Sequence, residues 1–133
     1  VLIPANIKVT IQENLPIFFG NTLKFKQVFQ NLIQNAIRFN DKEEGTIEVG
    51  LTEKNEYFEF FVKDNGIGIK EAYFDRIFRV FTKLESTSSS SGIGLSIVTK
   101  IIKYYKGVIW LESKEGIGTT FYFTILKNTK DLN

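Results

Sequence analysis

The segment "TLKFKQVFQNLIQNAIRFN", residues 22–40, carries the most regular pattern in this sequence. Its apolar residues recur at intervals of three and four, which places them on one face of an α-helix. These residues are Phe25, Val28, Phe29, Leu32, Ile33, Ala36 and Ile37. Asn21 stands just before them and belongs to the residue types that cap helix N-termini. The sequence therefore predicts an amphipathic helix that starts at Thr22, ends near Asn40 and packs its apolar stripe against another layer.

The polar side of the same helix carries Asn31, Asn35 and Arg38, which the spacing of four and three places on one face. One interpretation is that these residues form the solvated side of the helix. The other is that the amide oxygens ligate a hard cation such as Mg²⁺, held jointly with phosphates, while Arg38 contacts a phosphate oxygen. The helix alone does not decide between them.

The remaining patterns predict five strands and a second long helix. Alternation predicts a strand over residues 6–12, a hairpin of strands over 45–53 and 57–64, and two closing strands over 108–113 and 119–126. A second amphipathic helix is predicted over 92–107, with Gly107 at its end and a short helical piece before the Ser-rich loop 82–91. Its apolar residues are Leu95, Val98, Ile101, Ile102 and Tyr105.

This order of elements predicts an α+β fold, a two-layer α/β sandwich. We expect a mixed, mostly antiparallel sheet of about five strands, covered on one face by about three helices.

Composition limits the possible functions. The 133 residues suit one domain, residues 1–133, and 43% are hydrophobic, so the chain can form a core. No Cys and no His occur, which excludes a disulfide framework, a thiolate metal site and a histidine acting from within this sequence. The net charge of +2 gives no reason to expect nucleic acid as a partner. No apolar run reaches the ~18 residues of a membrane span, and we expect a cytoplasmic location.

Two glycine-containing segments are candidate ligand sites. In "DNGIGI", residues 64–69, Asp64 ends a predicted strand, and its carboxylate can accept a hydrogen bond from an exocyclic amine such as N6 of adenine. In "SSSSGIGLSIV", residues 88–98, a loop runs into a helix N-terminus, an arrangement suited to phosphates. Alternatively, the first is an Asx-type turn and the second a linker with a helix cap. The helix face with Asn31 and Asn35 and the two glycine-containing segments, occurring in this order, are together more specific for function than any one of them alone.

These segments, together with "FDRIFRVF" (residues 74–81) and "GVIWLESKEGIGTTFYFTIL" (107–126), resemble the asparagine, glycine and phenylalanine boxes of sensor histidine kinases. The resemblance extends from about Ile7 to Leu126. It implies the catalytic, ATP-binding domain of such a kinase, in a superfamily shared with topoisomerase, mismatch-repair and heat-shock chaperone ATPases. It also implies an α/β sandwich with an ATP lid.

On the phosphate side, the resemblance implies that Asn35 binds Mg²⁺ and that Asn31 lies beside it as a possible second ligand. Asn31 and Arg38 would be the catalytic residues. Arg38 stands where this family usually carries Lys, and Phe39 stands where Tyr is common, so an aromatic wall remains beside the nucleotide.

On the adenine side, the resemblance implies that Asp64 binds the amino group of the base. Gly66 and Gly68 would shape the turn beneath the base, with Ile69 packing on it, and Thr119 would join the network of water molecules around adenine. The resemblance further implies that residues 82–91 form the lid. The ATP-binding residues of that region would be Phe78, Phe81, Lys83, Ser91, Gly92, Gly94 and Leu95. Ser90 departs from the family, which usually has a further glycine there.

Position 31 distinguishes branches of the superfamily. The ATPase members typically carry Glu there, which can activate water as a general base, whereas the amide of Asn31 cannot accept a proton. We therefore expect the domain to hold Mg²⁺ and ATP and to donate the γ-phosphate to a histidine on a separate dimerisation domain, for relay to an aspartate of a response-regulator receiver domain.

Since the sequence begins with Val1, we expect a fragment of a longer protein whose His-containing domain precedes it. The fragment is expected to be monomeric, and its parent a homodimer that is cytoplasmic or anchored in a membrane. Two alternatives remain open: a serine kinase of the anti-sigma-factor type, and a degenerate module that regulates a partner without catalysis.

Overall fold

The computed structural model describes residues 3–13, 15, 21–74, 77 and 90–127, with the side chains of the last range from Leu95 onward. Its sheet has the strand order β1-β2-β3-β5-β4. The strands are β1 (Ile7–Ile11), β2 (Gly45–Glu53), β3 (Tyr57–Asp64), β4 (Ile109–Lys114) and β5 (Gly118–Leu126). Only β1 and β2 run parallel, while the other neighbours are antiparallel. The prediction of a mixed, mostly antiparallel sheet is confirmed.

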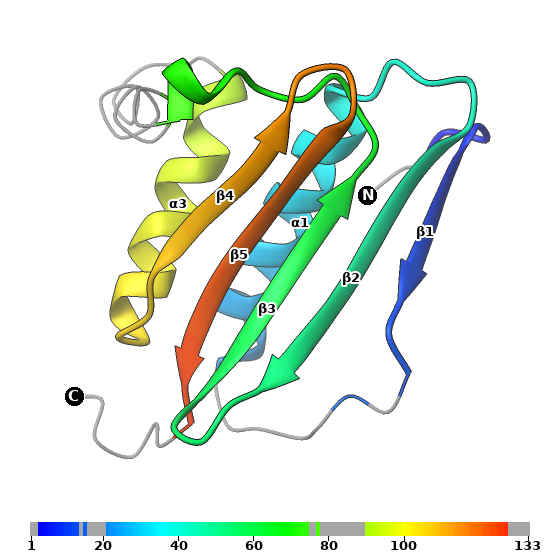
Figure 1. Cartoon of the computed structure of the whole chain (residues 1–133). Coiled ribbons are helices and arrows are strands. Elements are labelled where there is room, and N and C mark those ends of the chain that lie inside the picture. The colour runs from blue at the N-terminus through cyan, green and yellow to red at the C-terminus, as the bar shows by residue number, and fades with distance from the viewer. Residues whose placement is uncertain (1–2, 14, 16–20, 75–76, 78–89, 128–133) are drawn as a thin grey trace.

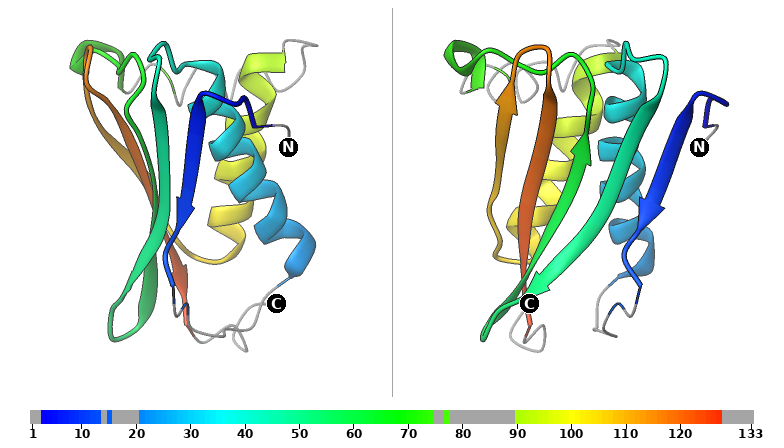
Figure 2. Two further views of the ribbon diagram at one scale, coloured as in Figure 1. Left: turned by 90° about the vertical axis from the view of Figure 1, so that its right-hand side faces the viewer. Right: turned by 45° about the vertical axis from the view of Figure 1, so that its right-hand side comes forward.

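The long helices α1 (Thr22–Arg38) and α3 (Ser90–Tyr104) lie side by side on one face of this sheet (Figures 1 and 2). A 3₁₀ helix, η1 (Glu71–Tyr73), follows β3. The predicted two-layer α+β arrangement is confirmed, but the count of about three helices is not. The described residues contain two α-helices and the short η1. Neither of these α-helices is long and apolar enough to cross a membrane.

Helix α1 begins where the sequence predicts. The Asn21 side-chain oxygen accepts a hydrogen bond from the Lys24 amide at 3.0 Å, which satisfies one of the free N–H groups of the first turn. The Asn21 amide in turn donates to the Tyr105 hydroxyl at 2.7 Å. Since Tyr105 directly follows α3, this contact joins the start of one helix to the end of the other.

The core between the layers is largely aromatic. Phe29 of α1 packs against Phe60 of β3 and Phe123 of β5, with ring centroids 5.6 and 5.5 Å apart, and the two strand residues stack at 5.0 Å. Such pairs add about 0.5–1.5 kcal/mol each beyond their buried area. All five apolar residues predicted for the second helix are buried. The aromatic cluster thus packs α1 on the sheet, and the buried aliphatic side chains of α3 complete the core.

The end of α3 differs in detail from the prediction. Gly107 was expected to stop the helix, but the residue with a left-handed backbone is Lys106, at a φ of 57°. The Gly107 amide donates to the Ile102 carbonyl and the Lys106 amide to the Lys103 carbonyl, both at 2.9 Å, as in a Schellman motif. Gly107 is required for another reason: a Cβ there would overlap the carbonyl oxygen of Thr124 on β5.

Candidate functional site

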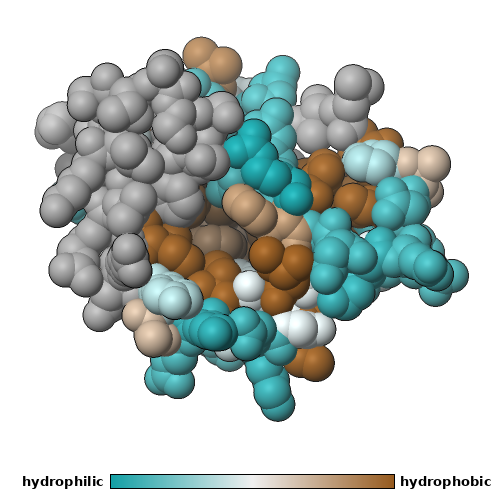
Figure 3. Space-filling model, turned by 90° about the horizontal axis from the view of Figure 1, so that it is seen from above, coloured by the Kyte–Doolittle hydropathy of each residue, from teal (hydrophilic) through white to brown (hydrophobic). Residues whose placement is uncertain are grey.

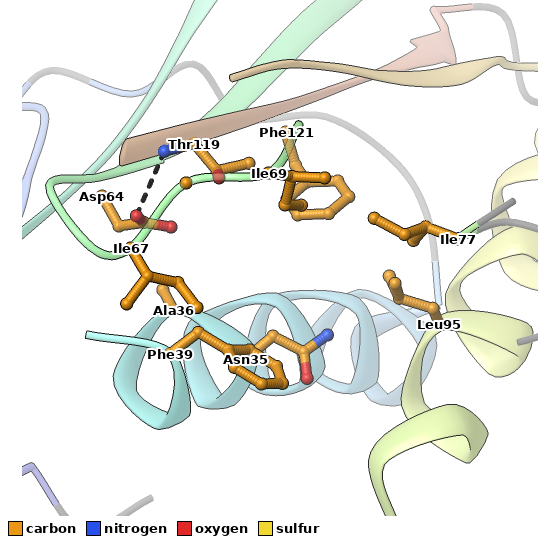
Figure 4. A pocket seen from close by; sticks show the side chains of 11 residues that line it. Asn35, Ala36, Phe39, Asp64, Ile67, Ile69, Ile77, Leu95, Thr119 and Phe121 are labelled. Atoms are coloured by element: carbon orange, nitrogen blue, oxygen red, sulfur yellow. Dashed lines mark hydrogen bonds between the residues drawn. The ribbon is translucent and has the colours of Figure 1, made fainter. Parts of the chain in front are cut away.

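A cavity of about 230 Å³ lies between α1, α3 and the end of the sheet where β3 finishes (Figure 4). It brings together residues predicted from separate parts of the sequence. These are Asn35, Phe39, Asp64, Gly68, Ile69, Leu95 and Thr119. Seen from above, apolar side chains gather in the middle of this end of the molecule, with hydrophilic ones around them (Figure 3). The cavity is therefore apolar, with polar groups at defined points.

The Asp64 carboxyl is one of these polar groups. Asp64 ends β3, and its Oδ1 accepts hydrogen bonds from the Gly66 amide at 2.8 Å and the Thr119 amide at 3.2 Å. Burial raises the pKa of the Asp64 carboxyl above its ordinary value, while the two N–H donors act in the opposite direction. The carboxyl group is thus held firmly and partly shielded from water, so a ligand that donates a hydrogen bond would interact with it strongly.

Asp64 and Thr119 are brought together by two interlocked turns. We call residues 64–69 the glycine turn and residues 114–118, which lead from the last residue of β4 to the first residue of β5, the hairpin turn. The Gly116 amide donates to the Ile67 carbonyl at 2.7 Å, and the Ile69 amide donates to the Ser113 hydroxyl oxygen at 2.7 Å. These bonds join residues that are more than 40 positions apart in the sequence.

The glycines of the two turns allow this close approach. Gly68 has a φ of 73°, and a Cβ on it would overlap the Lys114 carbonyl oxygen. Gly118 has a φ of 143°, and a Cβ on it would overlap the Asp64 carbonyl oxygen. Larger residues at either position would therefore push the turns apart. The glycine at 68, expected beneath the base, is explained here by contact with the hairpin turn.

The C-terminal end of α1 is fixed to the glycine turn as well. The Phe39 carbonyl accepts a hydrogen bond from the Ile67 amide at 3.0 Å. The Asn40 side-chain Nδ2 donates to Asn65 Oδ1 at 2.8 Å, and the same oxygen accepts from the Thr46 backbone amide at 2.8 Å. The cavity wall formed by α1 therefore keeps a fixed position relative to Asp64.

The three polar residues of α1 differ in their position relative to the cavity. Asn35 lines the cavity, and its side chain lies along the α1 wall in Figure 4. Asn31, one turn earlier, is half-buried and Arg38 is exposed, and neither is among the lining residues. Of the other predicted residues, Gly66 does not line the cavity but donates a hydrogen bond from its backbone N–H to the Asp64 carboxylate.

The amide oxygen of Asn35 fits a hard cation such as Mg²⁺, which prefers oxygen ligands. The described residues hold no group of three His, Cys, Asp or Glu side chains suited to a metal ion. A magnesium ion at Asn35 would accordingly depend on a bound molecule, such as a polyphosphate, for further ligands.

Sequence reasoning missed part of the apolar wall, namely Ala36, Ile67, Ile77 and Phe121. Two signals for it were present. Ala36 belongs to the apolar stripe of α1 beside Asn35, and Phe121 lies two residues after Thr119 on β5, so both point to the same face of the sheet.

Some predictions lie outside the described residues, namely Phe78, Phe81, Lys83 and most of the predicted lid. Ser91, Gly92 and Gly94 lie in the first turns of α3, whose helical backbone starts at Ser90.

Comparison with known proteins gave consistent matches. Residues 20–129 match the family model described as histidine kinase-, DNA gyrase B-, and HSP90-like ATPase. Cyanobacterial phytochrome B of Nostoc sp. is 42% identical over 125 residues, covering 91% of this chain and 17% of that protein. The methanogenesis regulatory histidine kinase FilI of Methanothrix harundinacea is 39% identical over 120 residues, covering 90% and 14%.

Among solved structures, the catalytic domain of histidine kinase ThkA superposes with a TM-score of 0.74 at 32% identity, covering 92% of this chain and 80% of that one. The chain spans less than a fifth of the length of the phytochrome and of FilI.

Proposed function

Because the chain belongs to the family of histidine kinase-, DNA gyrase B- and HSP90-like ATPases, among the catalytic domains of histidine kinases, we propose that its cavity binds Mg-ATP and that it donates the γ-phosphate to a histidine of a separate dimerisation domain. The acceptor would belong to the same protein, and its phosphate would pass to an aspartate of a response-regulator receiver domain.

The observation that carries this proposal is the pairing of Asp64 with Thr119 at the polar end of an otherwise apolar cavity. A flat base with an exocyclic amine suits such a site, since its faces pack on apolar walls while the amine donates to a carboxylate. Ile67 and Ile69 of the glycine turn would contact one face of adenine, and Phe39 would lie beside the nucleotide.

The phosphates would extend along α1 toward the start of α3. Asn35 would hold Mg²⁺ through its amide oxygen, with Asn31 as a possible second ligand, and the ion would supply charge neutralisation on the phosphate oxygens. The N-terminus of α3, where Gly92 and Gly94 lie, would contribute free N–H groups and a partial positive charge. Arg38 would add a cation that moves toward the phosphates when nucleotide binds.

Transfer to histidine, and not to water, is supported by position 31. The Asn31 amide cannot act as a general base, so this residue does not activate water for attack on the γ-phosphate. The sequence contains no His, so an acceptor histidine has to come from another domain. The residues of this chain would therefore position ATP and stabilise charge until that histidine arrives.

Calorimetry with Mg-ATP tests the binding site. Asp64→Ala removes a half-buried, charged acceptor that contributes on the order of 1.5–3 kcal/mol, so affinity should fall about tenfold or more. Glu53→Ala is a matched control because Glu53 is an exposed carboxylate at the opposite end of the sheet, where it bonds to Lys127. Equal affinity of wild type and Asp64→Ala would show that the base does not bind here.

The transfer step is tested by joining the domain to a His-containing dimerisation domain and supplying labelled ATP. We expect acid-labile, base-stable phosphate on the histidine, lost in Asn35→Ala. Acid-stable phosphoserine on a partner would instead indicate a serine kinase.

A further inference from the structure

Ser113 of β4 does not line the cavity, yet it contacts both turns that form the cavity's polar end. Its hydroxyl oxygen accepts from the Ile69 amide at 2.7 Å, donates to the Gly118 carbonyl at 2.9 Å and lies 2.7 Å from Thr119 Oγ1. The strand register places Ser113 directly opposite Thr119. One hydroxyl group therefore lies behind the wall of the cavity and joins three separate points of it.

The number of protons determines how these contacts are arranged. A serine hydroxyl has a single proton and two lone pairs, the Gly118 carbonyl can only accept, and the Ile69 amide can only donate. All three contacts are hydrogen bonds only if the Ser113 proton goes to Gly118 and the Thr119 hydroxyl donates to Ser113. The proton of Thr119 then points away from the cavity, and its oxygen offers only lone pairs to a ligand.

The neighbouring Asp64 carboxylate, like the Thr119 hydroxyl, offers only hydrogen-bond acceptors to a ligand. Asp64 Oδ1 already accepts from the Gly66 and Thr119 amides, and Oδ2 has no donor within the part of the chain that the structure describes. An ionised Asp64 and a Thr119 held in this way together present acceptors, so the polar end of the cavity attracts a donor and repels another acceptor.

We propose that Ser113 is a positioning residue that fixes the Thr119 hydroxyl as an acceptor and thereby makes the site select purines with an amino group at C6 over purines with a carbonyl there. This inference rests on the proposed binding of a purine nucleotide in the cavity. An amino group at C6 can donate hydrogen bonds to the Asp64 carboxylate and the Thr119 hydroxyl oxygen. A carbonyl oxygen at C6 has no proton to donate, so it is repelled by these acceptors. Without Ser113, the Thr119 hydroxyl can rotate and donate to that carbonyl.

The test compares the affinities of Mg-ATP and Mg-ITP, which differ at C6, by calorimetry. Wild type should favour ATP, and Ser113→Ala should reduce the ratio of the two dissociation constants by about tenfold, the effect of one hydrogen bond made or left unmade. Ser113→Cys keeps the size of the side chain but accepts hydrogen bonds weakly, so the ratio should fall partway. This variant also serves if Ser113→Ala does not fold.

Thr124→Val is the matched control. Thr124 lies at the other end of the same hairpin, where its hydroxyl accepts from the Val108 amide at 3.0 Å, so the change removes a comparable bond far from the cavity. It should lower stability and leave the ratio unchanged. In a Thr119→Val background, Ser113→Ala should have no further effect on the ratio, because its action passes through the Thr119 hydroxyl.

If Ser113→Ala and Ser113→Cys weaken both nucleotides equally, the residue is only structural and the proposal is wrong. The proposal is also wrong if Ser113→Ala changes the ratio of the ATP and ITP dissociation constants as much in the Thr119→Val background as it does in wild type. Failure of wild type to bind ATP would instead overturn the proposed function itself.

Discussion

Replacing Gly68 by alanine tests whether contact between the two turns holds the candidate site in shape. A Cβ at Gly68 would stand 2.7 Å from the Lys114 carbonyl carbon and would overlap its oxygen, and the residue has a φ of 73°. Gly116 offers a matched control, because its φ of 81° is similar but a Cβ there would meet nothing within 4 Å. Any difference between the two alanine variants therefore reports the close approach and not the backbone conformation.

The two effects have different magnitudes. Placing alanine in a left-handed conformation costs about 1–2 kcal/mol, which both variants share. Forcing atoms into an occupied site costs a further ~1–3 kcal/mol through displacement of the backbone, which applies to Gly68→Ala alone. We expect Gly116→Ala to lose about 1–2 kcal/mol of the free energy of unfolding and Gly68→Ala roughly 2–5 kcal/mol.

Urea unfolding of the nucleotide-free domain measures these losses, with the two variants compared at equal m-values. Gly68→Ala should also weaken binding of Mg-ATP more than Gly116→Ala does, because Asp64 lies in the glycine turn and Thr119 directly follows the hairpin turn that the substitution pushes away from it. Equal loss of stability in the two variants would refute the idea that packing of the turns requires glycine at position 68.

Three further outcomes are expected. Burial raises the pKa of the Asp64 carboxyl above 3.8, so its contribution to the free energy of unfolding is complete below that pH and is lost as the pH rises through the pKa of the folded form. Urea unfolding of nucleotide-free Asp64→Asn between about pH 3 and about pH 7 should lack this loss, and a parallel pH dependence in both proteins would contradict it. Lys106→Gly should raise the free energy of unfolding by about 1 kcal/mol, because glycine adopts a φ of 57° without strain; an unchanged denaturation midpoint would count against this. Phe123→Ala removes a fully buried ring from the core and should cost about 3–5 kcal/mol in thermal or urea unfolding, and a loss below about 1 kcal/mol would mean that the ring is not packed as described.

Local patterns in the sequence were sufficient for most of the fold. The stripe of α1 and the strands at 45–53 and 57–64 follow from periodicity, and the structure has the strand bounds as predicted. Periodicity depends on residues close in sequence, so it locates elements well. It does not reveal that Lys106, and not Gly107, takes the left-handed conformation, because that depends on how closely Gly107 approaches Thr124 on β5.

The candidate site was predictable where one residue type carries the chemistry. Asp64 and Asn35 could be singled out because a carboxylate after a strand and an amide on a helix face have specific uses, and both line the cavity. Ser113 and the Asn40–Asn65 pair gave no such signal. Their contacts span 44 and 25 positions and depend on strand register and on the shapes of two turns, which a single sequence does not encode locally.

The interlocked turns also determine where this domain can be altered by protein engineering. Tips of hairpins are ordinarily good positions for inserting a tag or opening a chain, because few contacts hold them. The hairpin turn is an exception, since its Gly116 amide is bonded to Ile67 and any added residue would separate Thr119 from Asp64. The β2–β3 connection at residues 54–56 lies at the opposite end of the sheet, so a reporter or a new terminus belongs there (Figure 1).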